Sequence, residues 1–225
     1  MDTGSIASAM PCSFSETMPV LPPQLAALSH RLLPVDQEVA PPDAHGRQAA
    51  VLILLFPEDA DIRFPLTVRP ESLTRHAGQI SLPGGLVESS DGTPWEAALR
   101  ETREEVGVST ESVVPVGRLA THHLTVSDYF IGPFVGWLGA PPHMHPDPVE
   151  VAEIFDVGVA DLLDPDSVAH EEWELRGRSW SVTFYRFGGR VVWGATARIL
   201  YEFACRLEDR PMPQGHVPGS VLPLE

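Results

Sequence analysis

The chain has 225 residues, with 31 acidic against 15 basic side chains and a formal net charge of -16. Every basic side chain is an arginine, because the sequence contains no lysine. This balance argues against a general nucleic-acid binder, which needs a basic face to displace counterions from phosphates. No apolar run approaches the roughly 20 residues of a membrane helix, and the first residues lack the basic and apolar parts of a signal peptide. We therefore expect a cytoplasmic protein without membrane attachment, whose isolated Cys12 and Cys205 are reduced thiols.

Three regions are predicted from composition. Residues 1–42 form a proline-rich leader, in which "PPQLAALSHRLL" (22–33) predicts one short helix. A single domain is expected over 43–208, and the proline- and glycine-containing tail 209–225 is expected to be flexible. If leader and tail contribute neither core nor site, a chain from Pro41 to Arg210 should fold by itself.

Strands surround two or three helices within the expected domain. "AAVLILLF" (49–56) predicts a buried strand, and "FPLTVR" (64–69) continues in extended form. Four more strand-like stretches follow an acidic helix, in the order "VVPVGRLATHH", "SDYFIGPFVGWLG", "VAEIFDVGV" and "SWSVTFYRF". "GATARILYEFACRLE" (194–208) has apolar residues at helical spacing and closes the domain. This order predicts a layered, mixed α/β fold.

The acidic helix lies in "TPWEAALRETREEVGV" (93–108) and has marked ends. Thr93 is a suitable N-cap, Pro94 suits the first helical position, and Glu96 completes a capping box. Gly107 suits the left-handed position after the last turn. The spacing of Ala98, Thr102 and Val106 predicts a small apolar stripe.

Three glutamates converge on another face of this helix. Glu101, Glu104 and Glu105 stand at i, i+3 and i+4, where like charges repel by a few tenths of a kcal/mol per pair. An arbitrary pair of glutamates is more often only a solvated helix face. Here, however, Gly84 and Gly85 deliver the chain to the helix, and a Gly-Gly turn lets backbone groups approach a ligand closely. Mg²⁺ and similar cations prefer such oxygen ligands together with substrate phosphates.

Gly85 followed by "RETREEVGV" (100–108) resembles the Nudix box, a glycine followed by REUxEExGU with U an apolar residue. One additional residue separates the two parts, and the usual midpoint glutamate is absent, with Glu88 and Asp91 acidic instead. The coenzyme A pyrophosphatase branch has the same longer, Asp-containing loop. That branch also carries a segment that "LTVRPESLTRHAGQISLPGG" (66–85) matches, with Pro70, Thr74 and Leu82 as departures. The resemblance covers roughly residues 47–206 and implies an α/β/α sandwich with a mixed sheet.

The resemblance also implies a site for Mg²⁺ or Mn²⁺. Glu101 and Glu105 would be metal ligands, with the Gly85 carbonyl as a backbone ligand and catalytic Glu104 bound directly or through water. Arg100 would orient Glu104 by a bidentate contact. The remaining expected site residues are the substrate-binding Arg69, Arg75 and Gly84, with Arg69 and Arg75 meeting phosphates that include the 3′-phosphate of coenzyme A, and a catalytic base that is either Glu150 or Glu153.

The expected reaction is hydrolysis of coenzyme A, or of its acylated or oxidised forms, to 3′,5′-ADP and 4′-phosphopantetheine. Other Nudix substrates, such as ADP-ribose or NADH, and a non-catalytic nucleotide-binding module are the alternatives. Three intact glutamates argue against the module, which has no need for mutually repelling carboxylates. The oligomeric state stays open between monomer and homodimer, and so does the phosphorus that is attacked.

Two other groups of residues are weighed against simpler interpretations. His122, His123 and "HMH" (143–145) could share a transition metal, but they lack cysteines or a helical spacing, which favours ordinary loop or strand histidines. Phe134, Trp137 and Trp193 could stack on adenine, yet strand aromatics are more often core, so no role is assigned to them.

Overall fold

The computed structural model describes residues 18–40, 45–72, 78–124, 128–175, 177–213, 217–219 and 221–223. Its helices and strands follow each other in the order α1 Pro23–Ser29, β1 Arg47–Glu58, β2 Asp61–Val68, β3 Ile80–Ser81, β4 Gly84–Leu86, α2 Pro94–Val106, β5 Val114–Arg118, β6 His122–Leu124, β7 Tyr129–Trp137, β8 Glu153–Gly158, α3 Val159–Leu163, a 3-10 turn Pro165–Ser167, β9 Val168–Leu175, β10 Arg178–Phe187, β11 Arg190–Val192, α4 Gly194–Leu207 and β12 Val221–Pro223.

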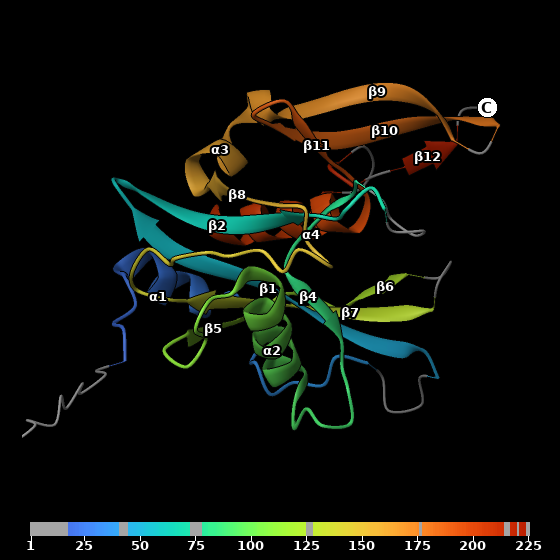
Figure 1. Cartoon of the computed structure of the whole chain (residues 1–225). Helices are drawn as coiled ribbons and strands as arrows, with labels where there is room; N and C mark the ends of the chain where they lie inside the picture. The colour runs from blue at the N-terminus through green and yellow to red at the C-terminus, as the bar shows by residue number, and fades with distance from the viewer. Residues whose placement is uncertain are drawn as a thin grey trace, which may run out of the picture.

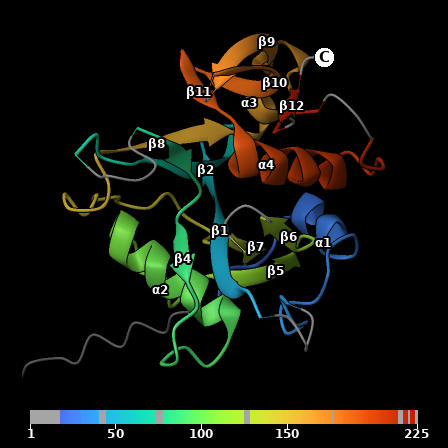
Figure 2. The ribbon, with the colours of Figure 1, turned by 90° about the vertical axis from the view of Figure 1, so that its right-hand side faces the viewer.

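The main sheet is mixed and is centred on β1 (Figure 1). β1 runs parallel to β7, whereas β2 and β4 pair with β1 in antiparallel fashion. β8 lies antiparallel along β2, with Leu66 opposite Phe155 and Val68 opposite Glu153. β9, β10, β11 and β12 form a second, antiparallel sheet, which lies above α4 in Figures 1 and 2.

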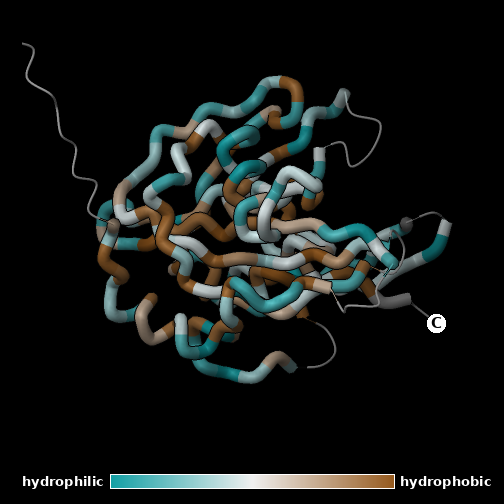
Figure 3. Tube along the Cα trace, turned by 90° about the horizontal axis from the view of Figure 1, so that it is seen from below, coloured by the Kyte–Doolittle hydropathy of each residue, from teal (hydrophilic) through white to brown (hydrophobic). Residues whose placement is uncertain are grey.

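Alternation along β1 divides the core into two clusters. Leu52 and Leu54 face α2, while Ile53 and Leu55 face α4 and α1. Burial of successive residues on opposite faces is what a strand covered on both sides requires. The hydropathy colours show brown, apolar segments gathered in the interior of the molecule (Figure 3). The predicted α/β/α sandwich with a mixed sheet is confirmed.

The described part of the leader packs on this core. The predicted helix exists as α1, and its Leu25 and Leu28 are 1% and 0% exposed within the larger cluster. Arg31 donates hydrogen bonds to the carbonyls of Arg206 and Leu207 at the end of α4, at 3.1 and 3.0 Å. The domain boundary after residue 42 stays a prediction. The described residues 18–40 do contribute to the core, so the condition under which a chain from Pro41 to Arg210 should fold by itself is not met. Apolar side chains between the prolines supply the contact.

The described part of the tail is also paired with the domain. β12 lies antiparallel to β10, and the Gly219 N–H donates to the Thr183 carbonyl at 2.8 Å. Proline and glycine content predicted flexibility here. An unpaired strand edge, however, offers backbone donors and acceptors that a short segment can satisfy.

No helix in the described parts of the chain is both long and apolar enough to cross a bilayer.

We predict that α1 is needed for folding. Leu28→Ala should lower the free energy of unfolding by about 2–5 kcal/mol, because it leaves a cavity between α1 and the sheet. Val20→Ala is the control, since Val20 is 87% exposed, and it should change stability by no more than about 0.5 kcal/mol. Urea denaturation of the whole chain measures both. Equal stability of the two variants would show that the leader does not contribute to the core.

Candidate active site

Helix α2 is fixed in position by its two ends and its buried face. The Glu96 N–H donates to Thr93 Oγ1 at 3.2 Å, and Gly107 adopts φ 71° with its N–H bonded to the Arg103 carbonyl. The predicted N-cap, first-turn proline and left-handed C-cap are therefore confirmed. Ala98 and Val106 are fully buried against the sheet, as the stripe predicted. This contact sets the rotation of the helix and hence the direction of its glutamates.

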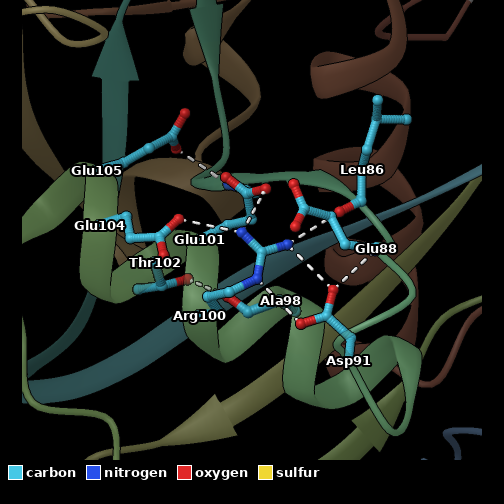
Figure 4. A network of polar contacts seen from close by, with 10 residues as sticks. Leu86, Glu88, Asp91, Ala98, Arg100, Glu101, Thr102, Glu104 and Glu105 are labelled. Atoms are coloured by element: carbon cyan, nitrogen blue, oxygen red, sulfur yellow. Dashed lines mark hydrogen bonds and ion pairs between the residues drawn. The ribbon is translucent and has the colours of Figure 1, made fainter.

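Arg100 lies at the centre of the polar network on α2 (Figure 4). Its Nε and Nη2 donate to the two carboxylate oxygens of Asp91 at 2.9 and 3.0 Å, and Nη2 also donates to the Leu86 carbonyl at 3.0 Å. Its Nη1 donates to Glu101 and to Glu104, both at 3.0 Å. These five contacts match the five N–H donors of a guanidinium. Arg100 thus links the loop before α2, the end of β4 and two glutamates of α2.

The expected bidentate contact between Arg100 and Glu104 is wrong. Asp91 is the bidentate partner, whereas Glu104 receives one hydrogen bond and its side chain is 53% exposed. The reason is geometric, because the loop before α2 presents both Asp91 oxygens to the guanidinium plane. The Arg100 hydrogen bonds hold the pKa of Asp91 below its usual range despite its burial. In the sequence, Asp91 is recognisable as an acidic residue of this loop, but its pairing with Arg100 is not.

Glu105 is the most deeply buried carboxylate on α2. It is 3% exposed, and its Oε2 accepts a hydrogen bond from the Gly84 N–H at 3.0 Å. Burial raises the pKa of Glu105 to about 7, and the negative charges of Glu101 and Glu150 act in the same direction. The Gly84 N–H and the Arg69 guanidinium favour the charged form, but burial outweighs them.

Glu101 lies against the second glycine of the turn. A Cβ at Gly85 would overlap the Glu101 carboxylate, and one at Gly84 would overlap the Ala50 carbonyl. Gly84 also has φ 149°, a conformation that other residues rarely adopt. Burial raises the pKa of Glu101, although Arg100 opposes this effect. Because neither glycine has a side chain, the backbone of this turn can lie directly against the Glu101 carboxylate and against β1.

The structure separates the two expected base residues. Glu150 is exposed, and its charge adds to the raised pKa of both Glu101 and Glu105, which places it in their vicinity. Glu153 begins β8 and forms an ion pair with Arg190. The positive charge of Arg69 lowers the pKa of Glu105. The Arg69 Nε is buried and has no hydrogen-bond partner among the described residues. Arg75 lies outside the described residues.

The carboxylates fit a hard divalent cation in chemical type. No three acidic, histidine or cysteine side chains already converge as a metal site in the described parts of the chain. One oxygen of Glu101 and of Glu104 is directed to Arg100, and one of Glu105 to Gly84; no described residue bonds the second oxygen of each. Burial disfavours the charged forms of Glu101 and Glu105, so a cation is the partner that would keep both ionised.

The histidines have other partners. His122 faces the buried Glu202 at 3.1 Å, and His123 stacks on Phe130 with ring centroids 4.2 Å apart. These contacts agree with the interpretation of ordinary strand and loop histidines. Of the three aromatics without an assigned role, Phe134 and Trp137 are buried core residues, whereas Trp193 is only half-buried.

Carboxylates beside a glycine turn are suited to a class of enzymes that cleave diphosphate linkages with a divalent cation. A family profile described as NUDIX domain matches residues 46–184. The chain therefore belongs to the Nudix family, and it is a hydrolase of nucleoside diphosphate derivatives.

Individual relatives agree with this assignment. A Pectobacterium atrosepticum protein named "Uncharacterized Nudix hydrolase NudL" is 31% identical over 194 residues, covering 85% of this chain and 100% of that protein. The Citrobacter koseri protein of the same name is 37% identical over 165 residues, covering 73% and 85%. "Nudix hydrolase 22, chloroplastic" of Arabidopsis thaliana is 34% identical over 182 residues, covering 78% of this chain and 60% of the plant protein.

We predict that Asp91 stabilises the fold more than Glu104 does, although both contact Arg100. Asp91→Asn removes a charged acceptor whose side chain is 5% exposed, and charge-assisted hydrogen bonds contribute about 1.5–3 kcal/mol. Glu104→Gln removes an exposed contact and should cost less than about 1 kcal/mol. Chemical denaturation in metal-free buffer compares them. A larger loss for Glu104→Gln would contradict the assignment of Asp91 as the main partner of Arg100.

Proposed function

We propose that the protein hydrolyses the diphosphate linkage of coenzyme A, or of its derivatives, to 3′,5′-ADP and 4′-phosphopantetheine. The observation that carries this proposal is the position of Glu105, buried against the Gly84 N–H, where the charges of Glu101 and Arg69 both act on it. Family membership supports the reaction type. The likeness of 66–85 and of the longer loop to the coenzyme A pyrophosphatase branch supports the substrate. The predicted cytoplasmic location is compatible with such a substrate.

Glu101, Glu104, Glu105 and the Gly85 carbonyl would hold Mg²⁺ or Mn²⁺. Such a cation, when bound, supplies positive charge to the diphosphate and lowers the pKa of water bound to it. Arg100 is a positioning residue, because its contacts hold Glu101 and Glu104 on one side and the Leu86 carbonyl on the other. The Gly84 N–H holds the Glu105 carboxylate in the same way.

Arg69 is proposed to bind the diphosphate itself. Two observations support this role: the charge of Arg69 acts on Glu105, and its buried Nε has no hydrogen-bond partner among the described residues. An arginine contact to phosphate is charge-assisted and strong. Glu150 is proposed as the base that accepts a proton from the attacking water, because it lies near both Glu101 and Glu105 and is exposed. The Arg190 ion pair makes Glu153 the weaker candidate.

Glu105→Gln should remove most turnover while thermal stability in metal-free buffer stays nearly unchanged. Glutamine keeps the acceptor for the Gly84 N–H but lacks the negative charge that a cation requires. Glu96→Gln is a matched control, since Glu96 lies exposed in the first turn of the same helix. Steady-state kinetics with Mg²⁺ and with Mn²⁺ are the measurement. Substantial activity in a folded Glu105→Gln variant would reject Glu105 as a ligand.

The substrate is tested by a panel of coenzyme A, dephospho-coenzyme A, ADP-ribose and NADH. Coenzyme A should have the highest kcat/KM of the four. Arg69→Ala should lower kcat/KM about tenfold to a hundredfold on coenzyme A and dephospho-coenzyme A alike, because it is proposed to meet the diphosphate that both contain. The exposed Arg103→Ala is the control. A clear preference for ADP-ribose would replace coenzyme A as the substrate, and a loss on coenzyme A alone would move Arg69 to the 3′-phosphate.

A further inference from the structure

The segment between β7 and β8 is attached to the C-terminal end of α2. The His145 N–H donates to the Val106 carbonyl at 2.8 Å, and the Asp147 N–H donates to the Glu105 carbonyl at 3.1 Å. The last carbonyls of a helix have no partner within the helix, so this segment satisfies two of them. Gly107 leaves room for it, because a Cβ there would lie 2.7 Å from the His145 carbonyl oxygen. The segment is therefore bonded to the same glutamate whose carboxylate lies in the candidate active site.

Asp147 holds the turn that leads from this attachment to Glu150. Its Oδ1 accepts a hydrogen bond from the Val149 N–H at 2.8 Å, which is an Asx-turn. Its carbonyl accepts the N–H groups of Glu150 and Val151 at 3.2 and 2.8 Å. Because Pro148 has no N–H, every backbone donor from 148 to 151 bonds to Asp147. One residue thus holds the whole turn and, through its own N–H, ties the turn to α2.

The far end of the turn is fixed to the sheet. Val151 is 2% exposed, and the Ala152 N–H donates to the Val68 carbonyl at 2.8 Å. The tip between the two fixed ends has no such support from packing, because Val149 is 72% exposed. No described residue forms a hydrogen bond or an ion pair with the exposed Glu150 carboxylate. The hydrogen bonds within the turn are therefore what determines the position of its tip.

The position of Glu150 is important for the reaction proposed above. Its negative charge acts on both Glu101 and Glu105, so it lies close to the α2 carboxylates. A general base must come within hydrogen-bond reach of the water that it deprotonates, and a displacement of about 1 Å can cost a large part of the rate. An exposed glutamate side chain is flexible and does not reach this precision by itself. A fixed backbone reduces the number of positions that its carboxylate can take.

We propose that Asp147 is a positioning residue, which holds Glu150 beside the α2 carboxylates by means of this turn. The proposal rests on the function proposed above, because it takes Glu150 as the base. It does not depend on which nucleoside diphosphate derivative is hydrolysed. The Asp147 carboxylate bonds to the Val149 N–H and takes no part in the proton transfer itself.

Steady-state kinetics with Mn²⁺, on the panel substrate that the parent hydrolyses fastest, test the proposal. Asp147→Ala should lower kcat about tenfold and leave KM and the half-saturating Mn²⁺ concentration nearly unchanged, because its N–H still bonds to the Glu105 carbonyl. Asp147→Asn keeps an oxygen acceptor and should restore most of the rate. Asp164→Ala is the matched control, since Asp164 Oδ1 accepts the Asp166 N–H at 2.9 Å in the turn before β9.

A double variant shows whether Asp147 acts through Glu150. Glu150→Gln should lower kcat about a hundredfold or more, and adding Asp147→Ala to it should cause no further loss, because the base to be positioned is already absent. Amide hydrogen exchange gives a readout that does not depend on turnover. In Asp147→Ala the Val149 N–H should exchange about tenfold faster, whereas the Gly107 N–H, bonded to the Arg103 carbonyl, should keep its protection.

The outcomes separate this proposal from the proposed function. If Glu150→Gln loses its rate and Asp147→Ala does not, or Val149 exchange is unchanged, the positioning role fails while the base stands. If the two losses multiply in the double variant, or the Mn²⁺ requirement rises in Asp147→Ala, Asp147 acts on the fold or on Glu105 and the proposal fails. If Glu150→Gln keeps the parent rate, the base of the proposed function is wrong, and the positioning role fails with it.

Discussion

The arrangement of the α2 carboxylates depends on the guanidinium of Arg100, whose five N–H groups all have acceptors. Glu101 and Glu104 repel each other at helical spacing, and Arg100 lies between them as the compensating charge. Because the same guanidinium also holds Asp91 and the Leu86 carbonyl, the helix cannot rotate or slide without breaking contacts to the loop. A lysine, with three donors on one nitrogen, could not make this set of contacts.

A different compensation applies to Glu105. Its partner is a backbone N–H rather than a cation, and that N–H is available because Gly84 adopts φ 149° close to β1. One hydrogen bond does not offset the burial of a carboxylate, as the raised pKa shows. The site therefore keeps a group whose charged form is disfavoured without a ligand. Such a carboxylate contributes little to stability and is best explained by the cation and diphosphate that it would meet.

Local patterns predicted the helix ends, the central strand and the apolar stripe of α2, because caps, alternation and helical spacing act within a few residues. The Arg100 partners could not be predicted in the same way, because Asp91 lies nine residues before Arg100 and only the path of the loop brings it to the guanidinium, whereas Glu104 stands at helical spacing. Nor could alternation distinguish Glu150 from Glu153 before the pairing of β8 with β2 was known. Composition was misleading where proline-rich segments carry a few apolar side chains, as at Leu25 and Leu28.

The two faces of β2 and β8 carry different side chains. On one face, α2 presents the carboxylates that are proposed to act on a diphosphate, which every nucleoside diphosphate derivative contains. On the other face, Trp173 of β9 and Trp193 just before α4 line a cavity together with Arg190 and Val191 of β11. The strand ends at Val68 and Glu153 join the faces, and Arg69 and Glu150 flank them. No described hydrogen bond or ion pair joins either indole to the α2 carboxylates or to Arg100, so substitutions of the indoles should leave the carboxylates and their arginine as they are.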